Sequence, residues 1–355
     1  MVKAKHTKKA AKSESEQPKR LHRMTKVGGI ILAILLAIVV AFLIWCQLRP
    51  LNTAALSTTA HPYTTYGTAD RAAEALVAAD KANTALNPDC GYRYLKQQAK
   101  VERVIVIRHG LTNCPRQFDQ LAERYHQMGY AVLVTRVPEH GMRDRMAPHF
   151  ADLTAERTLE DLSHSIDIAE GLGDEVDVMG LSAGGNEVAY IATQRDDIHQ
   201  AIIIDPIFTP TSVPTSLTRL VAGALLTIPN QFIWWSDKQR NLDGPASAYF
   251  GWQTRPVGEY LRITEGLLEK DRLPRSTHAV LITNENDAAV NNDTADLLAQ
   301  RWRNNDIDVT AYRFPKSEGL VHDLIDPLQV GANTAISYPQ IIELSTKNYT
   351  SHGHH

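Results

Sequence analysis

The sequence predicts an α/β fold in which a mostly parallel central sheet is flanked by helices and carries an inserted cap, behind an N-terminal transmembrane helix. Three observations predict this fold. Short apolar runs rich in β-branched residues alternate with helix-like segments, as they do in parallel sheets that are covered on both faces. One interval of 70 residues interrupts the alternation, and one uncharged apolar stretch lies near the N-terminus.

Residues 27–48 have the length and composition of a transmembrane helix. These 22 residues include no Asp, Glu, Lys or Arg, and at about 1.5 Å per residue they are long enough to cross a hydrocarbon core of roughly 30 Å. A cleaved signal peptide is the alternative, but its apolar region usually spans only about 7 to 15 residues. We therefore expect a retained anchor that contacts the lipid bilayer.

The distribution of charge predicts how this helix is oriented. Residues 1–26 contain nine Lys or Arg and two Glu, a local charge of +7, whereas the rest of the chain carries −10. Because Lys and Arg are retained on the cytoplasmic side, we expect a basic cytoplasmic tail, a single pass through the inner (cytoplasmic) membrane and a periplasmic or extracellular domain after Arg49. The overall charge of −3 gives no reason to expect nucleic acid as a partner.

Residues 49–87 are predicted to form a linker followed by an Ala-rich helix from Thr68 to Leu86. The α/β core is expected at residues 88–205 and 276–350. Its predicted strands are the apolar runs at residues 104–107, 131–134, 176–179, 201–204, 279–282 and 309–312. Its clearest helical segments are residues 118–128 and 159–172.

The interval at residues 206–275 is predicted to be a cap. It holds eight of the chain's 24 aromatic residues and seven of its 17 prolines. Trp234, Trp235 and Trp252 are expected to bind the apolar part of a substrate above a cleft. The alternative is that these rings form only the cap's own small core.

Two cysteines of the exported part are candidates for a disulfide. Cys90 and Cys114 lie where disulfides form and persist, and a bridge between them would contribute roughly 3 kcal/mol in the chain-entropy model. Two buried thiols are the alternative.

Residues 180–184, Gly-Leu-Ser-Ala-Gly, directly follow a predicted strand and precede a predicted helix. In that context the glycines permit a tight turn that exposes the hydroxyl of Ser182 above the sheet, and the helix N-terminus favours negative charge. Ser182 is therefore the candidate nucleophile. A serine in an ordinary turn is the alternative.

A serine hydroxyl needs a base and an acid that orients the base, in the chain order Ser, acid, His. Asp287 follows the fifth predicted strand and is the candidate acid, with Glu285 in the same loop and Asp205 after the preceding strand as alternatives. His322 follows the last strand and is the candidate base.

The first strand leads into His109-Gly110, two residues expected at the substrate site. A backbone amide after this glycine can point at the spot faced by the amide after the nucleophile, so Leu111 and Ala183 are the predicted oxyanion donors. His109 has no partner at metal-ligand spacing, and no metal is expected.

Residues 88–330 resemble the α/β-hydrolase superfamily, in its bacterial carboxylesterase and monoacylglycerol-lipase-like branch. The resemblance rests on His109-Gly110, a loop with His140-Gly141, the turn at Ser182, the turn at Asp287 and the loop with His322-Asp323. It implies a triad of Ser182, Asp287 and His322, a cap between the sixth and seventh strands of the family fold, and no cofactor.

These observations predict a membrane-anchored extracytoplasmic serine hydrolase that cleaves carboxylic esters, with a small-molecule ester or lipid-like substrate. An aminopeptidase or amidase is the first alternative, since an acidic cap residue such as Glu259, Glu265 or Glu269 would bind a substrate amine. A membrane-tethered binding protein without catalysis is the second.

Overall fold

The computed structural model describes residues 3–236 and 245–347, with side chains from Met24 onward. The chain divides into two units, residues 1–49 and 50–355. The first unit is helix α1, Lys3–Leu48. Within the described residues one helical segment, with a mean hydropathy of 3.2, is long and apolar enough to cross a membrane. The helix begins well before residue 27, because the Lys, Ala, Glu and Gln residues of the tail are good helix formers and continue the apolar helix.

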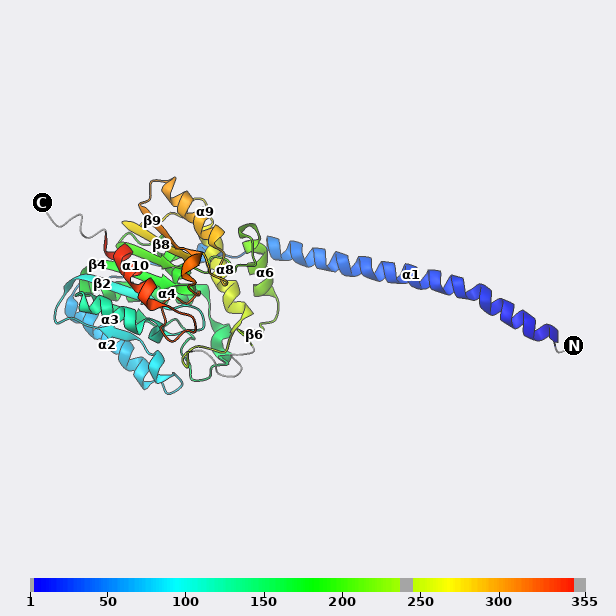
Figure 1. Cartoon of the computed structure of the whole chain (residues 1–355), viewed down its shortest axis with the longest axis horizontal. Helices are drawn as coiled ribbons and strands as arrows, with labels where there is room; N and C mark the ends of the chain where they lie inside the picture. Colours follow the sequence, from blue (N-terminus) through cyan, green and yellow to red (C-terminus); the bar gives the residue numbers. More distant parts are fainter. Residues whose placement is uncertain (1–2, 237–244, 348–355) are drawn as a thin grey trace. The chain divides into compact units, whose positions relative to one another are not determined.

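The second unit is built on a seven-stranded sheet with the order β1-β3-β2-β4-β5-β8-β9 (Figure 1). Every neighbouring pair is parallel except β1 and β3. This arrangement confirms the predicted fold class. The strands are β1 Arg93–Leu95, β2 Val101–Arg108, β3 Ala131–Thr135, β4 Gly173–Leu181, β5 Ile198–Ile204, β8 His278–Asn284 and β9 Val309–Phe314.

Helices cover both faces of the sheet, and alternate side chains of each strand pack against them. In β2, Val104 and Val106 join the core on one face, while Ile105 and Ile107 join the core on the other. The first face is covered by α2 (Tyr66–Ala82), α4 (Ala155–Leu172), α5 (Ala183–Ile191) and α9 (Asn292–Arg303). The second is covered by α3 (Asp119–Gln127) and α10 (Thr334–Thr346).

The segment between β5 and β8 contains α6 (Thr218–Thr227), β6 (Phe232–Trp234), β7 (Gly251–Gln253) and α8 (Thr254–Leu267). The strands β6 and β7 form a separate antiparallel pair. Helices α6 and α8 pack on each other through a small apolar cluster that also includes Leu51. Helix α8 is fixed to the core by Asn186 of α5, whose amide donates to the carbonyl of Tyr260 at 3.0 Å.

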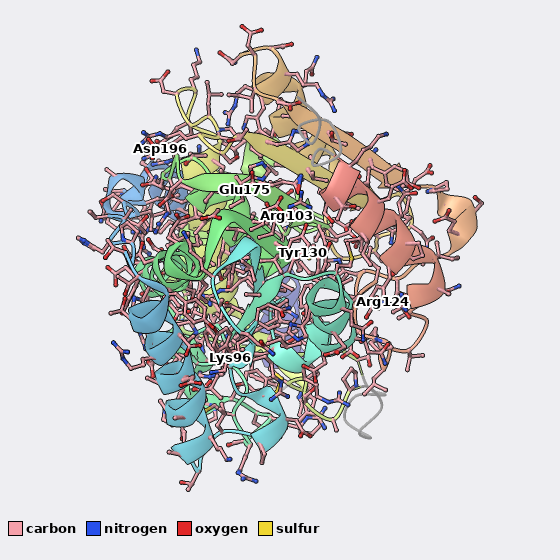
Figure 2. All side chains as sticks on the ribbon, turned by 90° about the vertical axis from the view of Figure 1, so that its left-hand side faces the viewer. Lys96, Arg103, Arg124, Tyr130, Glu175 and Asp196 are labelled. Atoms are coloured by element: carbon pink, nitrogen blue, oxygen red, sulfur yellow. A yellow bond between two sulfur atoms is a disulfide. The ribbon has the colours of Figure 1, made fainter. Side chains whose placement is uncertain are left out.

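The amino and carboxyl ends of the strands carry different kinds of residues. At the amino ends of β2 and β4, Arg103 lies 3.9 Å from Glu175 and above the ring of Tyr130 (Figure 2). The predicted functional residues lie at the other end of the sheet, in the loops that follow the carboxyl ends of the strands.

Candidate active site

Ser182 lies in the turn between β4 and α5 with φ 57° and ψ −113°. A positive φ is uncommon for a residue other than glycine and marks a strained turn. Both flanking glycines are required, because a Cβ on Gly180 would lie 2.3 Å from the backbone of Gly184, and one on Gly184 would lie 2.3 Å from the carbonyl oxygen of Arg108. The turn therefore places the serine side chain at the carboxyl edge of the sheet, beside the N-terminus of α5.

The ring of His322 lies between Ser182 and Asp287. Its Nε2 is 2.9 Å from the Ser182 Oγ, and its Nδ1 is 2.6 Å from Asp287 Oδ2. Because an ionised carboxylate can only accept, Nδ1 carries a hydrogen, and in the neutral ring Nε2 can then accept from the serine hydroxyl. The three side chains form one continuous hydrogen-bonded chain.

Asp287 is held rigidly in the loop after β8. Its side chain is fully buried, and its Oδ1 accepts hydrogen bonds from the backbone amides of Ala289 at 2.7 Å and Val290 at 3.1 Å. These contacts fix the direction of the other carboxylate oxygen. The alternative acid, Glu285, instead accepts from the backbone amide of Lys316 at 3.0 Å.

Asp205, the other alternative acid, lies at the end of β5 and is fully buried. Neither of its carboxyl oxygens has a hydrogen-bond partner among the described residues. Burial, reinforced by the nearby Asp287, raises the pKa of Asp205 well above its ordinary value. Asp205 therefore lies near Asp287 but is not part of the hydrogen-bonded chain of Asp287, His322 and Ser182.

Asp205, Asp287 and His322 are also the one group in the described part of the chain whose donor atoms lie close enough, within 4.8 Å of one another, for a metal ion. His322 Nδ1 and Asp287 Oδ2, which could each serve as a metal ligand, are already hydrogen-bonded to each other at 2.6 Å. Their geometry is that of a hydrogen bond, too short to admit an ion between them.

Charge around His322 favours its protonated form. Burial disfavours the charged ring, but the charge of the Asp287 carboxylate and its hydrogen bond to the ring outweigh this effect and raise the pKa of His322 to about 9.

Gly110 lies directly beside the nucleophile, where an added Cβ would approach the Cβ of Ser182 to 3.4 Å. The backbone amides of the next residue, Leu111, and of Ala183 form no hydrogen bond within the described residues. Two free amides near one hydroxyl are what an oxyanion site requires.

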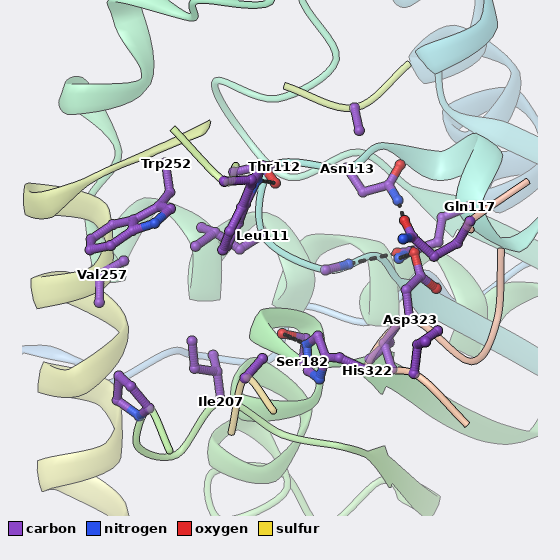
Figure 3. A pocket seen from close by; sticks show the side chains of 18 of the residues that line it. Leu111, Thr112, Asn113, Gln117, Ser182, Ile207, Trp252, Val257, His322 and Asp323 are labelled. Atoms are coloured by element: carbon purple, nitrogen blue, oxygen red, sulfur yellow. Dashed lines mark hydrogen bonds between the residues drawn. The ribbon is translucent and has the colours of Figure 1, made fainter. Parts of the chain in front are cut away.

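A cavity of about 600 Å³ opens at Ser182 (Figure 3). On one side of Ser182 lie the apolar side chains of Ile207, Trp252 and Val257, and on the other side lie the polar side chains of Asn113, Gln117 and Asp323 (Figure 3). Trp235 and Gln329 also belong to the cavity lining.

His109 and Trp234, which we expected at the substrate site, do not line this cavity. His109 is fully buried because both ring nitrogens bind backbone: Nε2 accepts from the amide of Val137 at 3.0 Å, and Nδ1 lies 2.9 Å from the carbonyl of Gly110. The ring of Trp234 packs against aromatic neighbours within the cap, including Phe232. Both residues hold the walls of the site in place without facing it.

The predicted disulfide between Cys90 and Cys114 is present. Cys114 closes the loop that follows Gly110, and the same loop is held to the cap at Thr112. The Thr112 carbonyl accepts from the amide of Tyr249 at 2.8 Å, and its hydroxyl accepts from the indole of Trp235 at 3.1 Å.

The polar side chains of the cavity were not predictable from the sequence pattern. Asn113 and Gln117 follow the His-Gly pair by a few residues, and Asp323 follows the candidate base directly. Proximity to the predicted site residues was the available signal, but their side-chain directions depend on loop conformations that the sequence pattern does not reveal.

Comparisons with known proteins agree with this geometry. A family model described as "Alpha/beta hydrolase family" matches residues 104–316. A thermostable monoacylglycerol lipase from Bacillus sp. (strain H-257) is 26% identical over 204 residues, which cover 55% of this chain and 75% of the relative.

Two solved structures share the fold. One comes from work on the metagenome-derived lipolytic enzymes LipS and LipT, with a TM-score of 0.56, 19% identity and coverage of 75% of this chain and 100% of the other. The second is a soluble variant of monoglyceride lipase from Saccharomyces cerevisiae, with a TM-score of 0.55, 13% identity and coverage of 72% and 90%.

Proposed function

Because the chain belongs to the alpha/beta hydrolase family, we propose that it is a carboxylic ester hydrolase with Ser182 as nucleophile, His322 as general base and Asp287 as the acid that orients the base. The observation that carries this proposal is the unbroken hydrogen-bonded chain from Asp287 through His322 to the Ser182 hydroxyl.

The reaction follows from the direction of these bonds. Nε2 of His322 takes the hydroxyl proton as Ser182 attacks the acyl carbonyl, and the charged ring is stabilised by Asp287. The ring then gives the proton to the departing alcohol, which leaves an acyl-enzyme. Water, activated by the same ring, attacks the acyl-enzyme and regenerates the serine.

The negative charge that develops on the carbonyl oxygen needs donors. We assign this role to the backbone amides of Leu111 and Ala183, which are free of other hydrogen bonds within the described residues. Each donor of this kind contributes on the order of 100- to 1000-fold in rate.

The cavity favours an ester with an apolar acyl group. Trp252 and Val257 lie on one side of Ser182, while polar side chains lie on the other side. The Bacillus relative is a monoacylglycerol lipase. A lipid-like or other small ester with an apolar acyl chain is therefore the proposed substrate class.

We propose further that the domain works outside the cytoplasmic membrane on a retained helical anchor. The apolar segment that follows a +7 tail supports this orientation. The disulfide between Cys90 and Cys114 supports an oxidising compartment.

The structure offers no support for the aminopeptidase alternative. None of the three acidic cap residues that we considered lines the cavity. Glu259 is paired with Arg262 at 3.0 Å, and Glu265 with Arg219 at 3.6 Å. Glu269 accepts from the hydroxyl of Thr53 at 2.6 Å.

The test uses the full-length chain in detergent. Ser182→Ala is expected to abolish hydrolysis of short- and medium-chain nitrophenyl esters and labelling by a fluorophosphonate probe. Ser212→Ala, which alters another serine of the cavity lining, is the matched control and should retain labelling. Turnover or labelling that survives in Ser182→Ala refutes the proposal, and a wild-type chain that never reacts with the probe favours a binding protein.

A further inference from the structure

A polar bridge joins the loop that carries the candidate base to the loop that carries the candidate oxyanion donor. Gln117 is its centre: its Nε2 donates to Asp323 Oδ2 at 2.8 Å, and its Oε1 accepts from the backbone amide of Gly110 at 2.8 Å (Figure 3). Asp323 directly follows His322, and Gly110 directly precedes Leu111. One side chain therefore connects the immediate neighbours of two groups that must act on the same substrate carbonyl.

The Asp323 end of the bridge is fixed to its own loop. Its Oδ1 accepts from the backbone amides of Ile325 at 3.2 Å and Asp326 at 3.0 Å, and its Oδ2 also accepts from Asn113 Nδ2 at 3.3 Å. With Gln117, four N–H groups are directed at one carboxyl group. Such a group cannot reorient without losing several hydrogen bonds at once.

The Gly110 end is fixed on both sides of the residue. Its amide is held by Gln117, and its carbonyl oxygen accepts from the amide of Asn113 at 3.2 Å and lies 2.9 Å from the Nδ1 of His109. In a trans peptide the next N–H points away from the carbonyl oxygen. Holding the Gly110 carbonyl thus determines the direction of the Leu111 amide.

Two of the bridging side chains are buried, with Gln117 only 2% exposed and Asn113 only 6%, whereas Asp323 is partly exposed. Removing the Gln117 side chain leaves the Gly110 amide and one Asp323 oxygen with fewer partners. Buried polar groups that lose a partner relax toward new ones, and here such relaxation displaces the loop.

We propose that Gln117 and Asp323 are positioning residues that keep the Leu111 amide aligned with His322, so that the oxyanion donor and the base form one rigid unit. This inference rests on the proposed function, since it assigns a purpose to residues around the same nucleophile. It adds two residues of the cavity lining that act through the Leu111 amide and His322 and are not themselves nucleophile, base or oxyanion donor.

A positioning role predicts a distinct kinetic signature. Leu111 meets its oxyanion only as the carbonyl becomes tetrahedral, so a displaced amide weakens the transition state more than the bound ester. Misplacement of an aligned group by about 1 Å can cost on the order of 100-fold. Gln117→Ala should therefore lower kcat by about 10- to 100-fold while KM changes by less than about threefold.

The experiment compares four variants of the full-length chain in detergent. They are Gln117→Ala, Gln117→Met, Asp323→Asn and the double variant Gln117→Ala with Asp323→Asn. Gln117→Met fills the space of the amide without its hydrogen bonds, so it addresses the bridge even where the alanine variant folds poorly. The readouts are kcat and KM for a nitrophenyl ester, the rate of fluorophosphonate labelling and the melting temperature.

Gln97→Ala is the matched control. Gln97 is another partly buried glutamine that bridges backbone groups, donating to the carbonyls of His126 at 3.2 Å and Tyr130 at 3.1 Å. It lies outside the residues of the cavity. Its loss should lower the melting temperature as much as the loss of Gln117 does, with kcat unchanged.

The expected result is that kcat and the labelling rate fall together in both Gln117 variants. The double variant should be little worse than the poorer single variant, because the two residues act as one unit. The inference is overturned when both Gln117 variants keep kcat within about twofold of the wild type, or when their losses match those of Gln97→Ala. The Ser182→Ala variant separates the two proposals. If it stays active, the proposed function is wrong, and if it is inactive while the Gln117 variants keep their activity, only the positioning role of Gln117 is wrong.

Discussion

Arg108 and Glu187 form a fully buried ion pair near the turn that holds Ser182, with the Arg108 Nε 2.7 Å from Glu187 Oε2. Arg108 ends β2, and Glu187 lies on α5, the helix that begins just after Ser182. The other oxygen of Glu187 accepts from the hydroxyl of Tyr260 on α8 at 2.7 Å. The pair therefore ties together strand β2, helix α5 and helix α8.

Breaking this pair should be costly. Arg108→Met leaves the Glu187 carboxylate buried without its cation, and such losses typically cost about 3–5 kcal/mol in the free energy of unfolding. The measurement is equilibrium denaturation in urea. Arg103→Met at the other end of β2 is the control, because Arg103 is partly exposed and its loss should cost about 1 kcal/mol or less. Equal losses from the two substitutions contradict the structural role given to the buried pair.

Activity should rise with pH across the neutral range. The proposed base acts only when neutral, and Asp287 raises the pKa of His322 to about 9 against the opposing effect of burial. We expect kcat/KM for a nitrophenyl ester to increase from pH 6 and to level off above about pH 9, after correction for spontaneous hydrolysis. His199→Gln should leave the profile unchanged, since His199 is outside the cavity. A profile that is flat above pH 6.5 contradicts the raised pKa.

The raised pKa of His322 should make the folded state less stable as the pH rises, whereas activity should increase. The folded pKa of His322 lies above its ordinary value of 6.5, so the folded state binds the proton more tightly than the unfolded state. Its contribution to stability is complete below pH 6.5 and is lost as the pH rises through about 9. The pH range of highest activity is therefore one in which this contribution has declined.

Replacing Asp205 should stabilise the protein at alkaline pH. Burial, with the nearby Asp287, raises the pKa of Asp205, so the folded state holds a proton that the unfolded state releases above its ordinary value of 3.8. Stability from this group falls as the pH rises from there. Asp205→Asn removes the titration and should raise the free energy of unfolding at pH 8.

Asp296→Asn is the control for this prediction. Asp296 is an exposed carboxylate paired with Arg313 at 2.7 Å, and its replacement should change stability by about 0.5 kcal/mol or less. The gain from Asp205→Asn should shrink as the pH is lowered toward 4. A variant that is less stable than the wild type at pH 8 shows that Asp205 is ionised and stabilising.

The sheet and the three hydrogen-bonded side chains of the candidate site were predictable from the sequence for a physical reason. Buried parallel strands need continuous apolar runs, and all six predicted runs lie within strands of the sheet. The turn at Ser182 needs its two glycines, so local sequence points to it. The expected chain order of Ser, acid and His then indicated the loops of Asp287 and His322. In the structure His322 lies within hydrogen-bond distance of both Ser182 and Asp287.

Features that depend on tertiary contacts were not predictable in the same way. Strand β1 is only three residues long and partly buried, so it lacks the apolar run that reveals the others. The short pair β6 and β7 is equally weak in pattern. The direction of His109 and the bridge made by Gln117 depend on loop conformations, because the partners of each side chain are backbone groups that the fold brings near.

The disulfide between Cys90 and Cys114 should stabilise the domain through the unfolded state. The two cysteines are 24 residues apart, and closing a loop of that size is worth about 3 kcal/mol in the chain-entropy model. The double substitution Cys90→Ala and Cys114→Ala should lower the free energy of unfolding by about this amount. Urea denaturation of the full-length chain measures it.

Reduction separates the bond from the packing of the cysteine side chains. A thiol reductant should destabilise the wild type by nearly as much as the double substitution and should leave the doubly substituted chain unaffected. Cys46→Ala is the control, because Cys46 is a free cysteine and its loss should leave the effect of the reductant intact. A reductant that does not alter the stability of the wild type, although it reduces the bond completely, shows that the bridge contributes nothing beyond packing.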